Sequence, residues 1–360
     1  MGPSRVVATR TRSSLGPSCA GKMVGADLAL QGEAPRELAV GSWPASLSVA
    51  VTRHRLGAMP ASIQAIAFES EGATLRGRLY LPDGEPPFPV VAMANGFSAT
   101  ITMTIHRYAE AFAASGAASL LWDHRNFGSS DGEPRQQINP WLQARGYRHA
   151  LDFLAAESRV DPERIGIWGD SMSGGVALVV AACDERVRAV VAQVPACGRT
   201  PPPEDPDGRR FAQIRTTLLD GDIDPTPETT VGPLPVVSAD QAGTPSLLTP
   251  LTAFRWFIEY GARHNSGWQN QATRAAPPVP EPYHPALAAP FVTVPTLALI
   301  SPDDEMPGAN PRVSRAAFLS IAGPTEIVDI EGGHFGIMFD PSPELESSIR
   351  TQTRFLMRHL

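Results

Sequence analysis

From residue 63 onward, short apolar runs alternate with longer segments in which apolar positions follow the helical repeat. Short apolar runs bounded by Gly, Pro or Asp are typical of buried strands, and the helical repeat is typical of helices packed on a sheet. The pattern predicts strands at 63–69, 74–81, 89–94, 117–122, 165–169, 187–194, 294–300 and 325–330. It predicts helices at 104–115, 139–157, 173–184, 310–321 and 342–359. This alternation favours an α/β protein with a mostly parallel eight-stranded sheet, helices on both faces, and two opening strands that can pair antiparallel.

The alternation stops within residues 195–295, which hold 18 of the 36 prolines, so long helices are disfavoured there. We interpret about 196–290 as an inserted cap. Within it, helical spacing predicts one helix that ends at Gly261. The apolar residues of this helix are Leu251, Phe254, Trp256, Phe257, Ile258 and Tyr260. They either pack the cap onto the sheet or line a substrate site, in which case Trp256 and Phe257 would contact an apolar acyl group.

Three polar residues, Ser171, Asp304 and His334, follow predicted strands, at the edge where parallel sheets bind ligands. Ser171 lies on a strand-to-helix turn between the small residues Gly169 and Ser173, which is how a fold displays a serine nucleophile. Taken alone, that turn could also be a glycine-rich connection without chemistry or a phosphate loop. The chain order Ser, Asp, His favours a nucleophile with its base and acid.

The segment Gly169-Asp-Ser-Met-Ser-Gly-Gly175 and the turn Gly332-Gly-His-Phe335 resemble motifs of the α/β-hydrolase superfamily. The resemblance extends from about residue 61 to the C-terminus. It implies the α/β-hydrolase fold, with Ser171 as the nucleophile and His334 as the base.

The same resemblance implies the remaining catalytic groups. The family's spacing after the acid-bearing strand implies Asp304 as the acid, with the adjacent Asp303 as its rival. The turn Asn95-Gly-Phe-Ser98 is similar to the family's oxyanion turn, with asparagine where histidine is usual. It implies the backbone N–H groups of Phe97 and Met172 as the oxyanion hole. Replacing histidine by asparagine changes the support of the turn and not the oxyanion donors, because these donors are backbone N–H groups.

A further loop, residues 123–132, is similar to the superfamily's Asp-x-Arg-Gly-x-Gly-x-Ser loop. We interpret it as a scaffold that braces the loops around the nucleophile. Its continuation, 132–143, resembles a branch that contains polyketide transferases, trans-acting thioesterases and peptidase-like acyl esterases.

Composition fits a soluble enzyme with one catalytic domain. The 360 residues are 42% hydrophobic, and no apolar run is long enough for a membrane span. A net charge of −7 without a basic cluster in the body disfavours nucleic acid and membrane partners. Cys19, Cys183 and Cys197 are few and lack metal-ligand spacing, which favours reduced thiols in a cytoplasmic protein.

The N-terminal segment differs in charge from the rest of the chain. Up to residue 59 it carries seven basic and three acidic residues, although the whole chain is acidic. We expect residues 1–58 to be disordered or extended, with the hydrolase domain at 59–360.

Other residues add little. His106 follows the oxyanion turn and is either a substrate contact or a histidine on a helix surface. No phosphate loop, dinucleotide fingerprint or metal-ligand spacing is visible, so no cofactor and no metal is expected.

The sequence therefore predicts a serine hydrolase that cleaves an ester or thioester of an apolar acyl substrate through an acyl-enzyme on Ser171. An acyltransferase or cyclising thioesterase of secondary metabolism, using the same three residues, is one alternative. A non-catalytic ligand-binding protein on a hydrolase fold is another. The expected partner is a small acyl substrate, which a carrier protein or coenzyme A could present. The acyl group, the leaving group, the acceptor and the oligomeric state stay open.

Overall fold

A computed structural model describes residues 60–360. The predicted disordered or extended segment 1–58 lies outside the described residues and stays a prediction.

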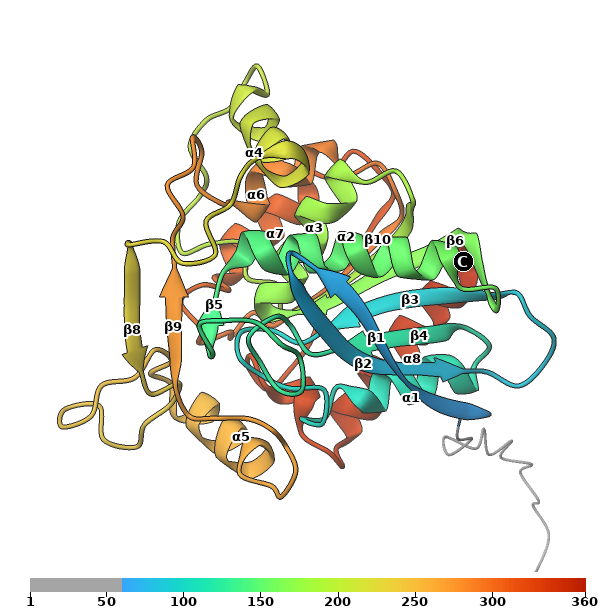
Figure 1. Cartoon of the computed structure of the whole chain (residues 1–360), viewed down its shortest axis with the longest axis horizontal. Helices are drawn as coiled ribbons and strands as arrows, with labels where there is room; N and C mark the ends of the chain where they lie inside the picture. Colours follow the sequence, from blue (N-terminus) through green and yellow to red (C-terminus); the bar gives the residue numbers. More distant parts are fainter. Residues whose placement is uncertain (1–59) are drawn as a thin grey trace, which may run out of the picture. The chain divides into compact units, whose positions relative to one another are not determined.

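The centre of the described region is one eight-stranded sheet in the order β1-β2-β4-β3-β6-β7-β10-β11 (Figure 1). The strands are β1 Ser62–Ser70, β2 Ala73–Leu81, β3 Phe88–Ala94, β4 Ala118–Trp122, β6 Val160–Asp170, β7 Val187–Gln193, β10 Thr296–Ile300 and β11 Thr325–Asp329. Only the β1–β2 and β2–β4 pairings are antiparallel. The other pairings in this sheet are parallel. The predicted sheet is therefore confirmed, except that β6 begins five residues earlier than expected.

Helices cover both faces of this sheet (Figure 1). They are α1 His106–Ala114, α2 Pro140–Ala156, α3 Ser171–Cys183, α7 Pro311–Leu319 and α8 Pro343–His359. The apolar sides of α1 and α8 pack into one core cluster, and those of α2 and α3 pack into another on the opposite face. The sequence sets three of the helix starts, where Asn139, Asn310 and Ser342 accept backbone N–H groups just before a proline at the first helical position.

The insertion contains more regular structure than the prolines suggested. It holds α4 Arg209–Asp220, β8 Thr230–Leu234, α5 Leu251–Gly261, β9 Ala272–Ala275, α6 Pro285–Ala288 and the short helix η1 Ala289–Phe291. β8 and β9 form a second sheet with β5 Gln137–Ile138, in the order β5-β9-β8. Neither α4 nor this sheet was predicted. The prolines flank α4 and β9 rather than interrupt them, whereas Pro233 lies within β8.

The two parts of the insertion pack on different faces of the large sheet. Buried side chains of α4 join the core cluster of α2 and α3, whereas those of α5 join the cluster of α1 and α8. The predicted helix at α5 is confirmed with its end at Gly261, but only some of its apolar residues are buried. Trp256 and Tyr260 are buried, whereas Leu251 is 71% exposed and Ile258 is also exposed.

Candidate active site

The turn at Ser171 is strained in a way that depends on its neighbours. Ser171 begins α3 directly after β6 and has φ = +50°, a left-handed conformation that is costly for a residue with a side chain. A side chain at Gly169 would clash with the backbone of Ser173, so only glycine fits there. The sharp turn leaves Ser171 half-buried at the carboxyl edge of the sheet.

The structure brings together three of the predicted residues. Nε2 of His334 lies 2.9 Å from Oγ of Ser171, and Nδ1 of His334 lies 2.7 Å from Oδ2 of Asp304. The side chains of His334 and Asp304 are each only 2% exposed. Asp304 and His334 follow the neighbouring parallel strands β10 and β11, which accounts for their convergence. The rival Asp303 is exposed and is not part of this chain of hydrogen bonds.

Glu305 is a residue of this site that the sequence reasoning missed. Its Oε2 accepts the backbone N–H of His334 at 2.9 Å, and its Oε1 accepts the hydroxyl of Thr252 from α5. Gly333 has φ = +71°, and a Cβ there would come within 2.5 Å of Oε2 of Glu305. Glu305 thus holds the His334 turn against the insertion. The acidic run after β10 was the only signal for it.

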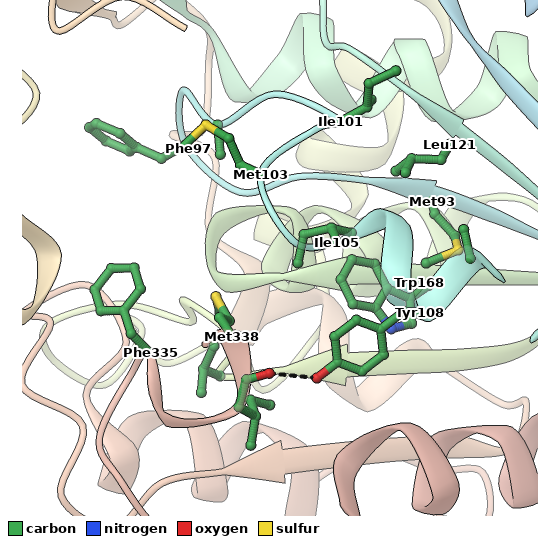
Figure 2. Close-up of a cluster of buried hydrophobic side chains, with 14 of the residues drawn as sticks. Met93, Phe97, Ile101, Met103, Ile105, Tyr108, Leu121, Trp168, Phe335 and Met338 are labelled. Carbon is green, nitrogen blue, oxygen red and sulfur yellow. Dashed lines mark hydrogen bonds between the residues drawn. The ribbon is translucent and has the colours of Figure 1, made fainter. Parts of the chain in front are cut away.

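A hydrogen bond from α1 also holds the loop after His334. This loop contains the short helix η2 Gly336–Met338, and the hydroxyl of Tyr108 on α1 donates to the carbonyl oxygen of Ile337 at 2.8 Å. Figure 2 shows this hydrogen bond, with Phe335 and Met338 on the same loop. Burial raises the pKa of Tyr108, so the phenol stays protonated and donates.

The predicted oxyanion turn lies beside Ser171. Phe97 has φ = +53°, and within residues 60–360 its N–H donates no hydrogen bond. The N–H of Met172 belongs to the first turn of α3, where helical N–H groups have no partner within the helix. The neighbouring Gly96 N–H donates to Oδ1 of Asp170 at 2.8 Å, which ties the turn to the residue before Ser171. Both backbone N–H groups are therefore available to an oxyanion.

A buried hydrogen-bond chain gives a structural role to Ser173, the serine that departs from the family pattern. The hydroxyl of Ser173 donates to the backbone oxygen of Asn95 at 2.6 Å and lies 2.9 Å from Nε2 of His124. Burial lowers the pKa of His124 to about 3, so its imidazole is neutral. Since the Ser173 proton is used on Asn95, Nε2 of His124 carries the proton and donates to Ser173. The chain fastens the oxyanion turn to α3 through the backbone oxygen of Asn95. Within residues 60–360, the side-chain amide of Asn95 is buried without a hydrogen-bond partner, and nothing in the structure explains why asparagine stands there.

Asp170 is a second residue that sequence reasoning missed. It is 3% exposed, and desolvation raises the pKa of its carboxyl to about 7, against the opposing effects of the Gly96 N–H and His334. A signal existed, since a carboxylate stands between an apolar strand and an apolar helix.

Two cavities meet at Ser171. The smaller, of about 30 Å³, is lined by Asp170, Ser171, His334 and the aromatic residues Phe97, Trp256, Phe257 and Phe335. The larger, of about 580 Å³, extends under the insertion. Trp256 and Phe257 therefore lie at the site and also in the core. His106 lines neither cavity, so the structure gives no support for a substrate contact.

The loop after β4 acts as a scaffold. The carboxylate of Asp123 accepts the backbone N–H groups of Ile101 and Ser129 and the hydroxyl of Ser129. It thereby holds the segment that follows the oxyanion turn.

Within residues 60–360, no group of three or more His, Cys, Asp or Glu side chains could hold a metal ion.

Comparisons with known proteins agree with this fold. Residues 71–200 match the family model for X-Pro dipeptidyl-peptidases of the S15 family. The chain is 44% identical over 125 residues to a thiohydrolase from Aspergillus aculeatus, covering 35% of this chain and 39% of the relative. It is 41% identical over 125 residues to a polyketide transferase from Stachybotrys chlorohalonatus, covering 35% and 41%. These matches span about two-fifths of the relatives' length.

A solved structure covers more of the chain. The α/β hydrolase GrgF from Penicillium sp. sh18 superimposes with a TM-score of 0.63 at 25% identity, covering 83% of this chain and 99% of that one. Together with the strand order and the Ser171 turn, this places the protein in the α/β-hydrolase superfamily. None of the helices in the described part of the chain is long and apolar enough to cross a membrane.

Proposed function

We propose that the protein is a serine hydrolase that cleaves an ester or thioester of an apolar acyl substrate through an acyl-enzyme on Ser171. The observation that carries this proposal is the continuous chain from Asp304 through His334 to Ser171, at 2.7 and 2.9 Å, which ends at a serine that lines both cavities. The named thiohydrolase and polyketide transferase relatives support acyl chemistry of this kind.

The geometry suits each step. The carboxylate of Asp304 accepts from Nδ1 of His334, which leaves Nε2 free to take the proton of Ser171 as its Oγ bonds to the acyl carbon. The N–H groups of Phe97 and Met172 receive the charge on the carbonyl oxygen. The bond to the leaving group then breaks as His334 returns the proton to the leaving oxygen or sulfur. Water, deprotonated by the same imidazole, attacks the acyl carbon of the acyl-enzyme. The bond to Oγ of Ser171 then breaks, His334 returns the proton to Oγ, and the acid is released.

A transferase that uses another acceptor is the second candidate. The polyketide transferase relative favours it, because such an enzyme passes the acyl group to a molecule other than water. A cyclising thioesterase would use an acceptor within the acyl chain itself. A ligand-binding protein without catalysis is disfavoured by the complete hydrogen-bonded chain at Ser171.

Partner and compartment belong to the same proposal. A carrier protein or coenzyme A could present the acyl group as a thioester. We further propose a cytoplasmic location, which the free, buried thiols of Cys183 and Cys197 support.

Labelling with a fluorophosphonate tests the nucleophile. The probe should modify Ser171, identified by peptide mass spectrometry, and Ser171→Ala should abolish labelling while the far-ultraviolet circular dichroism stays unchanged. Labelling that survives Ser171→Ala would refute this nucleophile. Incubation with acyl thioesters, with and without added alcohols or amines, then distinguishes water from another acceptor. If the acyl-enzyme decays equally fast with and without the added nucleophile, the enzyme is a hydrolase.

A further inference from the structure

The larger cavity carries positive charge without acidic compensation. Arg199 and Arg274 line it, and its described lining includes no Asp or Glu. His284 also lines it, but burial lowers the pKa of its imidazole, which is therefore neutral near pH 7. Arg199 is exposed, whereas Arg274 is half-buried on β9 between β5 and β8. The charge thus faces a space that also includes Ser171.

Arg274 has no polar partner within the described residues. In residues 60–360 its guanidinium makes no ion pair and donates no hydrogen bond, although most other half-buried arginines in the body make several. Its one specific contact is with an aromatic ring, since the guanidinium lies 5.0 Å from the ring centroid of Phe97. Burial and the nearby Arg199 both lower its pKa, as expected for a cation that lacks a counter-ion.

A cation in this position costs free energy unless a ligand compensates it. The planar guanidinium presents its donors in a fork that matches a carboxylate or phosphate. Phe97 orients it, and the backbone of Phe97 is the turn where the reacting carbonyl would bind. A group held by Arg274 would therefore belong to a substrate whose ester or thioester lies at Ser171.

We infer that the substrate carries an anionic oxygen group, a carboxylate or phosphate, that binds Arg274 in the larger cavity. This inference rests on the proposed acyl chemistry and names a property of its substrate. A carboxylate would lie on the acyl chain, whereas a phosphate would come from a pantetheine arm. The apolar lining of the same cavity, which includes Leu247, Leu248 and Met306, would hold the chain between the anion and Ser171.

Matched thioesters test this. N-acetylcysteamine thioesters of an adipoyl chain, with the far carboxyl free or as its methyl ester, differ in charge and by one methyl group. The ratio of kcat/KM for the anionic over the neutral thioester should fall by about tenfold or more in Arg274→Met, because hydrogen bonds to charged groups are worth about 1.5–3 kcal/mol. Arg274→Lys should retain part of the ratio. Arg255→Met is the matched control, since Arg255 also stacks on a phenylalanine, at 4.7 Å from Phe339, but lines neither cavity.

Hexanoyl thioesters of coenzyme A and of N-acetylcysteamine form the other arm. If the Arg274-dependent preference is for coenzyme A, the anion is the phosphate, and if it is for the free adipoyl carboxyl, the anion belongs to the acyl chain. Equal losses for charged and neutral substrates in both arms would overturn the inference.

A binding measurement keeps the inference separate from the proposed function. Monomethyl adipate and coenzyme A are titrated calorimetrically into Ser171→Ala, with and without Arg274→Met. If wild type cleaves no thioester, the proposed function fails and this comparison alone decides: Arg274-dependent binding of either anion supports the site, and binding that ignores Arg274, or no binding, refutes it.

Discussion

Replacing Ser173 by alanine tests whether the oxyanion turn is held by the buried chain through His124 and Asn95. Ser173 is fully buried, and its hydroxyl has two partners, at 2.6 and 2.9 Å. Both partners are buried as well, His124 at 2% exposed and the Asn95 residue at 1%. Neither can therefore turn to bulk water when the hydroxyl is removed.

The cost follows from the two groups that lose a partner. A buried donor or acceptor left unpaired costs about 1–3 kcal/mol, and Ser173→Ala leaves an N–H of His124 and the carbonyl of Asn95 in that state. A small shift of His124 toward Asn95 would recover part of this. Two fully unpaired groups would cost roughly 2–6 kcal/mol, so with this relaxation we expect the free energy of unfolding to fall by about 2 kcal/mol. Because Asn95 begins the oxyanion turn, kcat should also fall, by less than the loss of about 10²–10³ that follows deletion of one oxyanion donor.

Ser119 on β4 provides a matched control. It is also fully buried, but within residues 60–360 its hydroxyl has no hydrogen-bond partner. Ser119→Ala should therefore leave stability unchanged or raise it slightly. Urea denaturation of both variants, with m-values compared to detect changes in the unfolded state, measures the difference. If Ser173→Ala costs no more than Ser119→Ala, the hydrogen-bond chain does not support the turn and this reasoning is wrong.

The remaining predictions concern the acid, a buried carboxyl and the small cavity. Asp304→Asn should lower kcat by about 10⁴, because the amide favours the wrong imidazole tautomer, while Asp303→Asn should have a mild effect; steady-state kinetics with the opposite ranking would reassign the acid. Asp170 has a raised folded pKa, so its contribution to stability is present below about pH 4 and lost as pH rises to about 7, up to about 4 kcal/mol. Between about pH 4 and pH 7, the melting temperature should therefore fall less steeply with pH in Asp170→Asn than in the wild type. Parallel profiles of melting temperature against pH would contradict the raised pKa. Trp256→Ala should lower stability by about 3–5 kcal/mol and shift kcat/KM toward larger substrate groups, whereas Leu251→Ala, on the exposed side of the same helix, should do neither; unchanged selectivity would make Trp256 core only.

Local sequence determined the central sheet and the position of its site. The central strands β3, β4 and β10 could be predicted because each is a short apolar run with Gly, Pro or Asp near its ends, and these signals act within a few residues. Ser171 and His334 could be predicted for the same reason. The turns that carry them need glycine close by in sequence, at Gly169 and Gly333, so neighbouring residues determine the backbone conformation of each turn.

Tertiary structure decided which of several similar residues take part. Asp303 and Asp304 are adjacent and chemically equal, and only the path of the loop after β10 directs Asp304 to His334. The same loop brings Glu305 under the His334 turn.

The second sheet and the charge of the larger cavity also depend on long-range contacts. β5, β8 and β9 are short segments from distant parts of the chain, and each lacks a pattern strong enough to specify a strand alone. Their pairing places Arg274 against Phe97, about half the chain away in sequence. A periodic pattern reports which face of an element is buried, but not which distant element covers it. That choice is made by the free energy of packing the whole chain, so the partners at this site emerge only in three dimensions.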